Sequence, residues 1–135
     1  MPIAFAAQLP YLLHTNRELG LMLAKKKPLA HFADRKGSFP KLVQRYLRLF
    51  DRHVRGGNIV RQDVLVAPDD CRSYTLHRIL FSLPGEEWRM DAMVQLMESP
   101  VWGPEQERRE GELLGYDDWM NDHFLALRYP KQNGS

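Results

Sequence analysis

The chain has 135 residues, of which 44% are hydrophobic and 27% are charged, and its formal net charge is +2. This length fits one domain with one core, which needs neither a metal nor a disulfide for stability. The single cysteine, Cys71, excludes an intramolecular disulfide and favours a reducing, cytoplasmic location. No window has the roughly 20 apolar residues of a membrane-spanning helix, and the apolar N-terminus lacks the basic segment of a signal peptide, so we expect a soluble protein.

The small net charge conceals a strong division of charge along the sequence. Segment 25–61 contains eleven Lys or Arg and two acidic residues, whereas segment 84–122 contains eleven Asp or Glu and three arginines. This division fits an acidic or nucleic-acid partner for the basic half. It fits equally well two halves that face each other within the fold or across a dimer.

The N-terminal half predicts a helix, a strand and a second helix. The spacing of apolar residues places the first helix at 17–26, with Thr15 or Asn16 as its cap. The short apolar run 28–34 predicts a strand. Segment 40–57 predicts the longest helix, because a proline suits its first turn, an apolar stripe runs along it and a glycine pair can end it.

The C-terminal half predicts an antiparallel pair of strands followed by three helices. The strands lie within 58–68 and 73–83. After a Pro84-Gly85 turn, one helix carries a methionine-rich stripe and ends before Ser99. A second, acidic helix occupies 103–115, with Gly115 as its left-handed C-cap.

We expect Asp117 or Asp118 to cap a last helix, with Met120, Phe124 and Leu127 facing inward. The order of elements predicts an α+β fold, in which a small antiparallel sheet of about three strands is covered by about five helices. It predicts a single domain over residues 1–135, with loosely ordered ends at about 1–10 and about 129–135.

Five basic residues share one face of the longest predicted helix, because they are spaced by four, three, four and three positions. They are Lys41, Arg45, Arg48, Arg52 and Arg55. A row of cations on a rigid helix can bind phosphates or another anionic partner, and arginine offers two-point hydrogen bonding. Tyr46 and Phe50 fall on the opposite, apolar face, so no platform for stacking single-stranded bases accompanies the row.

Two other interpretations of the basic row stay open. It can be the ordinary solvated face of an amphipathic helix. It can also pair with the predicted acidic helix, within one chain or across a dimer. The acidic residues in question are Glu105, Glu107, Glu110 and Glu112.

Histidines and carboxylates are the candidate catalytic and metal-binding residues. On the last predicted strand, alternation places His77 on one face with Ile79 and Phe81, and His31 on the first strand can meet it across the sheet. Two imidazoles without a further ligand do not make a metal site, so we expect none. His14 lies one helical turn before Glu18, but outside the predicted helix.

Glu86 and Glu87 follow the Pro84-Gly85 turn, where the dipole of the following helix favours acidic residues. Adjacent helical residues diverge, so only one of the two glutamates can line a pocket, together with Trp88 or Arg89. Acid-base chemistry at this point also needs a histidine from the sheet.

The function that the sequence favours is a non-enzymatic protein-binding or regulatory module, which acts on a protein partner or as a homodimer. No motif identifies a known family, and no phosphate loop or nucleophile elbow is present, so we expect no cofactor. One alternative is a binder of nucleic acid or polyphosphate through the basic row. The other is a small hydrolase or transferase that uses His31 or His77 with Glu86 or Glu87.

Overall fold

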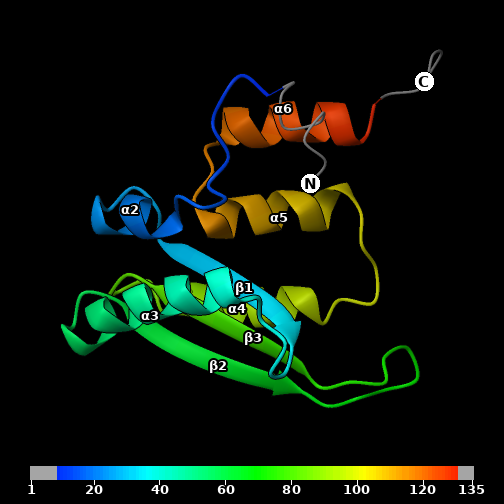
Figure 1. Cartoon of the computed structure of the whole chain (residues 1–135). Helices are drawn as coiled ribbons and strands as arrows, with labels where there is room; N and C mark the ends of the chain where they lie inside the picture. The colour runs from blue at the N-terminus through cyan, green and yellow to red at the C-terminus, as the bar shows by residue number, and fades with distance from the viewer. Residues whose placement is uncertain (1–8, 131–135) are drawn as a thin grey trace.

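The computed structural model describes residues 9–130 and contains five helices and three strands in that part of the chain (Figure 1). In order they are α2 (Glu18–Leu23), β1 (Leu29–Arg35), α3 (Lys41–Arg55), β2 (Val60–Val66), β3 (Leu76–Ser82), α4 (Trp88–Met97), α5 (Pro104–Leu114) and α6 (Asp118–Arg128). The predicted α+β class and the small antiparallel sheet are confirmed. The ends that we expected to be loosely ordered fall mostly outside the described residues.

The sheet has β3 at its centre, with β1 and β2 antiparallel on either side. In this register Ala30 of β1 pairs with Phe81, and Asp63 of β2 pairs with Ile79. Because side chains alternate along a strand, Ile79 and Phe81 face one side of the sheet and Leu80 faces the other. Helices cover both faces, so β3 contributes to two hydrophobic cores.

Aromatic rings fill the core between the sheet and α3. Phe50 of α3 stacks on Phe81 of β3, with ring centroids 4.2 Å apart, and Phe32 of β1 meets both rings edge-on. Tyr46 adds a fourth ring, and Met22 of α2 extends the core. The stripe predicted along this helix therefore faces the sheet.

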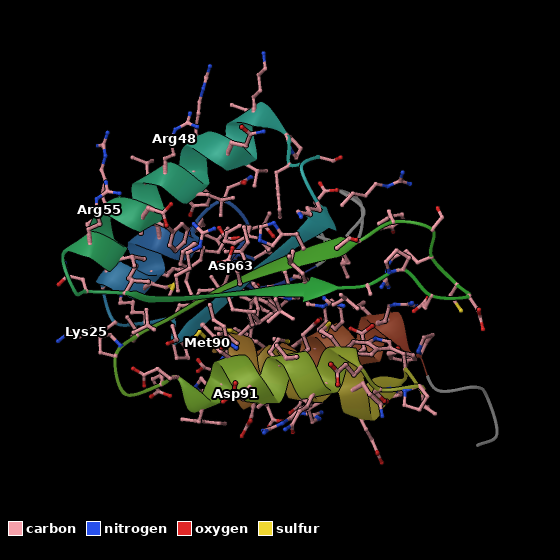
Figure 2. The ribbon with its side chains drawn as sticks, turned by 90° about the horizontal axis from the view of Figure 1, so that it is seen from below. Lys25, Arg48, Arg55, Asp63, Met90 and Asp91 are labelled. Carbon is pink, nitrogen blue, oxygen red and sulfur yellow. The ribbon has the colours of Figure 1, made fainter. Side chains whose placement is uncertain are left out.

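Methionine and aliphatic side chains fill the core on the other face, under α4 and α5. Its buried residues are Leu29, Leu80, Met90, Met93 and Leu113. Helix α6 packs on α5, on the far side from β1 (Figure 1). The three C-terminal helices thus form one layer, and α3 forms another on the opposite side of the sheet (Figure 2).

Helices α5 and α6 approach closely at Gly111, where a Cβ atom would overlap the side chain of Asn121. This contact corrects the predicted inward face of α6. Asn121 is 5% exposed and faces α5, whereas Leu127 is 37% exposed. The end of α5 follows the prediction, because Gly115 has φ 94° and ends the helix in the left-handed conformation.

The first helix is shorter than the predicted 17–26. It covers Glu18–Leu23, its N-cap residue is Arg17, and neither Thr15 nor Asn16 caps it. Asn16 (φ 66°) and Lys25 (φ 60°) adopt the left-handed backbone conformation, which cannot continue a right-handed helix. Between residues 9 and 130, no helix has the length and apolar character needed to cross a membrane.

Candidate binding site

Helix α3 exposes a basic face that consists of Lys41, Arg45, Arg48, Arg52 and Arg55. All five residues are exposed, and Figure 2 shows Arg48 and Arg55 pointing away from the sheet. Within residues 9–130, none of the five forms an ion pair. The basic face is therefore available to a partner.

The basic face is long and carries apolar residues along its side. With a rise of about 1.5 Å per residue, the fourteen steps from Lys41 to Arg55 span roughly 21 Å. Leu42 is 75% exposed and Leu49 is 43% exposed beside the cations. An open depression of about 460 Å³ lies among the arginine side chains, Leu49 and Asp51. Both charged and apolar contacts are thus offered to a partner.

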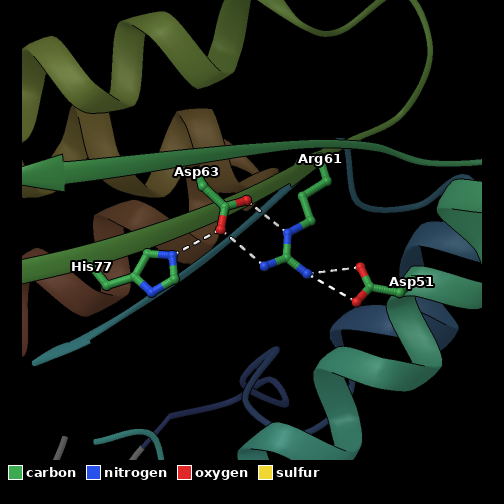
Figure 3. Close-up of polar contacts among 4 residues, drawn as sticks. All are labelled: Asp51, Arg61, Asp63 and His77. Carbon is green, nitrogen blue, oxygen red and sulfur yellow. Dashed lines mark hydrogen bonds and ion pairs between the residues drawn. The ribbon is translucent and has the colours of Figure 1, made fainter. Parts of the chain in front are cut away.

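Asp51 is the one acidic residue in the sequence of α3, and Arg61 of β2 neutralises it (Figure 3). Nη1 of Arg61 donates to both carboxylate oxygens of Asp51, at 2.8 and 2.9 Å. The charge of Asp51 is therefore compensated from the sheet, and Asp51 does not neutralise the cations of the basic face.

Arg61 also connects α3 to the two neighbouring strands. Its Nε and Nη2 donate to Asp63 at 2.7 and 2.9 Å, and Nε2 of His77 lies 2.8 Å from the same carboxylate. These hydrogen bonds, with that from Arg61 first, hold the pKa of Asp63 below its usual range. Figure 3 shows the chain of hydrogen bonds that runs from Asp51 of α3 through Arg61 and Asp63 to His77 of β3. We interpret this Arg61 network as the support that fixes α3 on the sheet.

The acidic helix α5 lies on the opposite side of the sheet from α3 (Figures 1 and 2). The interpretation in which the basic row pairs with this helix within one chain is therefore wrong. It fails because the sequence shows the division of charge but not which face of the sheet each helix covers. The structure instead places the basic face of α3 and the acidic helix α5 on opposite sides of the sheet.

The two candidate histidines lie on opposite faces of the sheet and do not meet. His31 pairs in register with Leu80, whereas His77 pairs with Asp34. His31 lies 3.3 Å from Nη1 of Arg78 on the α5 side, and burial, followed by the charge of Arg78, lowers its pKa to about 4. His77 belongs to the Arg61 network on the α3 side.

The candidate carboxylates at the start of α4 have local partners. Glu86 accepts a hydrogen bond from Arg89 at 2.7 Å, and Glu87 accepts one from the backbone N–H of Gly85 at 2.9 Å. Arg89 also donates to the carbonyl groups of Glu112 and Leu113 at the end of α5. The Arg89 guanidinium lies over the Trp88 ring, 4.7 Å from its centroid. These residues join α4 to α5, and none of the contacts described for them involves a histidine.

A buried lysine was not identified from the sequence. Lys27 is 2% exposed, and its Nζ lies 2.8 Å from both Nδ1 of His14 and the carbonyl oxygen of Leu114. The ring of Tyr116 lies near the ammonium group and stacks on His14 at 3.7 Å. Burial lowers the pKa of Lys27 to about 7. In the sequence Lys27 is the last of three consecutive lysines, and only the following residue, Pro28, distinguishes its position from the other two.

A pocket of about 240 Å³ between α5, α6 and the segment before α2 was also missed. Its walls include Tyr11, Glu107, Glu110, Tyr116, Asn121 and Phe124. These residues come from three parts of the chain, so no sequence spacing relates them. We call it the α5–α6 pocket.

No family model matches this chain, and no curated protein or solved structure matches it. Over residues 9–130, no group of three His, Cys, Asp or Glu side chains can hold a metal ion. The exposed basic face and the α5–α6 pocket are the two features of the described structure that we consider for binding.

Proposed function

We propose that the protein is a non-enzymatic binding module, in which the basic face of α3 binds an acidic segment of a partner protein. The observation that carries this proposal is the row of five exposed cations with no ion pair in the described chain. The Arg61 network supports it, because it removes the charge of Asp51 from the row and holds the helix in place.

The exposed leucines beside the arginines favour a protein partner over a nucleic acid. Leu42 and Leu49 match an acidic amphipathic helix, which carries apolar residues next to its carboxylates. A phosphate backbone offers no apolar surface for these two side chains to contact. Tyr46 and Phe50 pack in the core, so they are not exposed for base stacking.

The layout of charge argues against a dimer made by two basic faces. A twofold contact places the same patch on both subunits, so it would bring like charges together. A contact between the basic face and the acidic side of another copy relieves the repulsion but does not close into a dimer. A different protein in a reducing cytoplasm is the partner we propose, and the free, exposed Cys71 fits that compartment.

A hydrolase or transferase role has weaker support. His31 and His77 lie on opposite faces of the sheet, and Glu86 and Glu87 are bound to Arg89 and Gly85. Acid-base partners must lie within hydrogen-bond reach of one substrate.

The test is a binding titration with a labelled synthetic peptide that carries Glu and Leu at helical spacing, measured by fluorescence anisotropy at low salt. We expect Arg52→Glu to weaken binding at least tenfold, which corresponds to about 1.4 kcal/mol. Arg109→Glu is the matched control, because it is an exposed helical arginine on the acidic side, and we expect a change below twofold.

A mixed-sequence DNA duplex is titrated under the same conditions. Absence of peptide binding at about 50 mM salt contradicts the proposal, since ionic contacts are strongest at low salt. Tighter binding of the duplex than of the peptide also overturns it, and favours the nucleic-acid alternative.

A further inference from the structure

The α5–α6 pocket combines aromatic rings with two carboxylates. Tyr11 comes from the segment before α2, Tyr116 from the turn after α5, and Phe124 from α6. Glu107 and Glu110 are separated by three positions on α5, so they lie on the same face of the helix. The pocket therefore presents ring surface and negative charge together.

Hydrogen bonds hold the aromatic walls in place. The hydroxyl of Tyr11 donates to the carbonyl oxygen of Met120 at 2.9 Å. The hydroxyl of Tyr116 accepts from the backbone N–H of His14 at 2.8 Å, and the Tyr116 ring stacks on the His14 ring. These contacts fix the orientation of both tyrosines before any ligand binds, which reduces the entropic cost of binding.

The negative charge of the pocket is incompletely neutralised. The side chain of Glu107 is 13% exposed, its ion pair with Nε of Arg128 is long at 3.9 Å, and the hydroxyl of Tyr129 donates to it at 3.4 Å. Glu110 forms no ion pair in the part of the chain that the structure describes. Burial, followed by the charge of Glu107, raises the pKa of Glu110, although the charge of Arg78 acts in the opposite direction.

Two like charges in a partly buried pocket are unfavourable, and a bound cation removes that cost. Aromatic ring faces attract cations, most effectively where water is displaced. A volume of about 240 Å³ lies below the roughly 300 to 1,000 Å³ of sites for drug-sized ligands. The ligand must therefore be small.

We propose that the α5–α6 pocket binds a small organic cation, a primary amine or a quaternary ammonium compound, between the rings of Tyr11, Tyr116 and Phe124 and the carboxylates of Glu107 and Glu110. This site lies on the opposite side of the sheet from α3, and its binding activity does not depend on the function proposed for the basic face.

The first test compares choline with 3,3-dimethylbutan-1-ol, in which a carbon replaces the charged nitrogen and the shape is kept. Each compound is titrated into the isotope-labelled wild-type protein and followed by amide chemical shifts. We expect choline, or n-butylamine as the primary-amine probe, to bind at least tenfold more tightly than the neutral alcohol, with shifts concentrated in α5 and α6. Equal affinity for alcohol and cation, or no binding by any of the three compounds, overturns the proposal.

The second test removes one charge and keeps the shape of the side chain. Glu110→Gln should weaken binding of the better cation at least tenfold, whereas Glu105→Gln, at an exposed position on the same helix, should leave it within twofold. An unchanged affinity in Glu110→Gln contradicts the assignment. Arg52→Glu should leave cation binding unchanged, so failure of this site and failure of the basic face are seen separately.

Discussion

The two faces of the sheet are built in different ways from the same central strand. On the α3 side, a cluster of four aromatic rings packs among aliphatic residues, and exposed cations lie on the outer surface of one helix. On the α4 and α5 side, the core is aliphatic and methionine-rich, and polar groups such as Lys27 and Asn121 are buried near it. The surface on that side is acidic.

This difference suggests a division of roles between the two faces. The stacked and edge-on rings hold α3 in one position, from which its outer face can offer a constant pattern of charge. A core with buried polar groups is sensitive to protonation and leaves room for a polar pocket. We therefore expect the α3 side to be the rigid part of the molecule and the α5 side to respond to pH.

Phe50→Ala is the substitution with the largest expected effect, because the ring contacts Phe32, Tyr46 and Phe81. We expect it to lower the free energy of unfolding by about 4 kcal/mol, through lost burial and the cavity that remains. Met93→Ala, at an equally buried position of α4, should cost about 3 kcal/mol, since its flexible neighbours can fill part of the space.

Both losses are measured by urea denaturation followed by circular dichroism. Leu49→Ala, at an exposed position next to Phe50, is the control and should change stability by less than about 0.5 kcal/mol. A larger loss in Met93→Ala than in Phe50→Ala would show that the methionine-rich face is the more rigidly packed, which is the reverse of our comparison.

Lys27 should make the stability of the protein rise with pH. Burial lowers its pKa to about 7 in the folded state, against 10.5 for a free lysine, so between these values the unfolded chain binds more protons. The free energy of unfolding therefore increases as pH rises, by about 3 kcal/mol from pH 7 to pH 9.5. Lys27→Met should remove most of this rise.

The measurement is a series of urea unfolding curves at that range of pH for wild type, Lys27→Met and Lys26→Met. Lys26 is exposed, so its variant should keep the wild-type slope. Tyr116 and His14 lie beside Lys27, and the charge of Glu18 also acts on Lys27. Burial raises the pKa of Tyr116 and lowers that of His14 to about 4. Neither Tyr116 nor His14 therefore titrates in this pH range. Parallel curves for wild type and Lys27→Met would show that this lysine does not set the pH response.

Local patterns in the sequence predicted the elements well, because each depends on neighbouring residues. The period of the apolar stripe from Val43 to Val54 predicted α3, and the same period placed the five cations on its outer face. The alternation along β3 correctly separated His77 from Leu80. Gly115 predicted the end of α5 through its conformational freedom.

The sites depend on which elements meet, and no local pattern encodes that. The strand order brought β3 between β1 and β2, and the pairing register placed His31 on the face opposite to His77. The burial of Lys27 requires the carbonyl group of Leu114, which is 87 positions away. The α5–α6 pocket likewise needs three separate segments, so neither feature could be predicted before the fold was known.

Arg45→Gln has the smallest expected effect on stability and distinguishes the interpretations of the basic face. Lys41 and Arg48 lie one turn away on either side of Arg45, and such like-charge pairs each destabilise a helix by about 0.2 to 0.5 kcal/mol. Arg45 also lies away from the last turn, where the helix dipole favours cations. We therefore expect Arg45→Gln to raise the free energy of unfolding by about 0.5 kcal/mol at low salt, and to weaken binding of the acidic peptide. On α5, Arg109 lies one turn from Glu105 and Glu112, so Arg109→Gln should lower stability by a similar amount.

Both changes should disappear in about 0.5 M salt, because surface charges are then screened. A face that serves only to keep α3 solvated gains nothing from arginines that repel one another, since uncharged polar residues would solvate it as well. A row of like charges that destabilises its own helix is instead what a site for an anionic partner requires, because the partner removes the repulsion when it binds. If Arg45→Gln leaves stability unchanged or lowers it, the arginines support the helix, and the solvated-face interpretation becomes the better one.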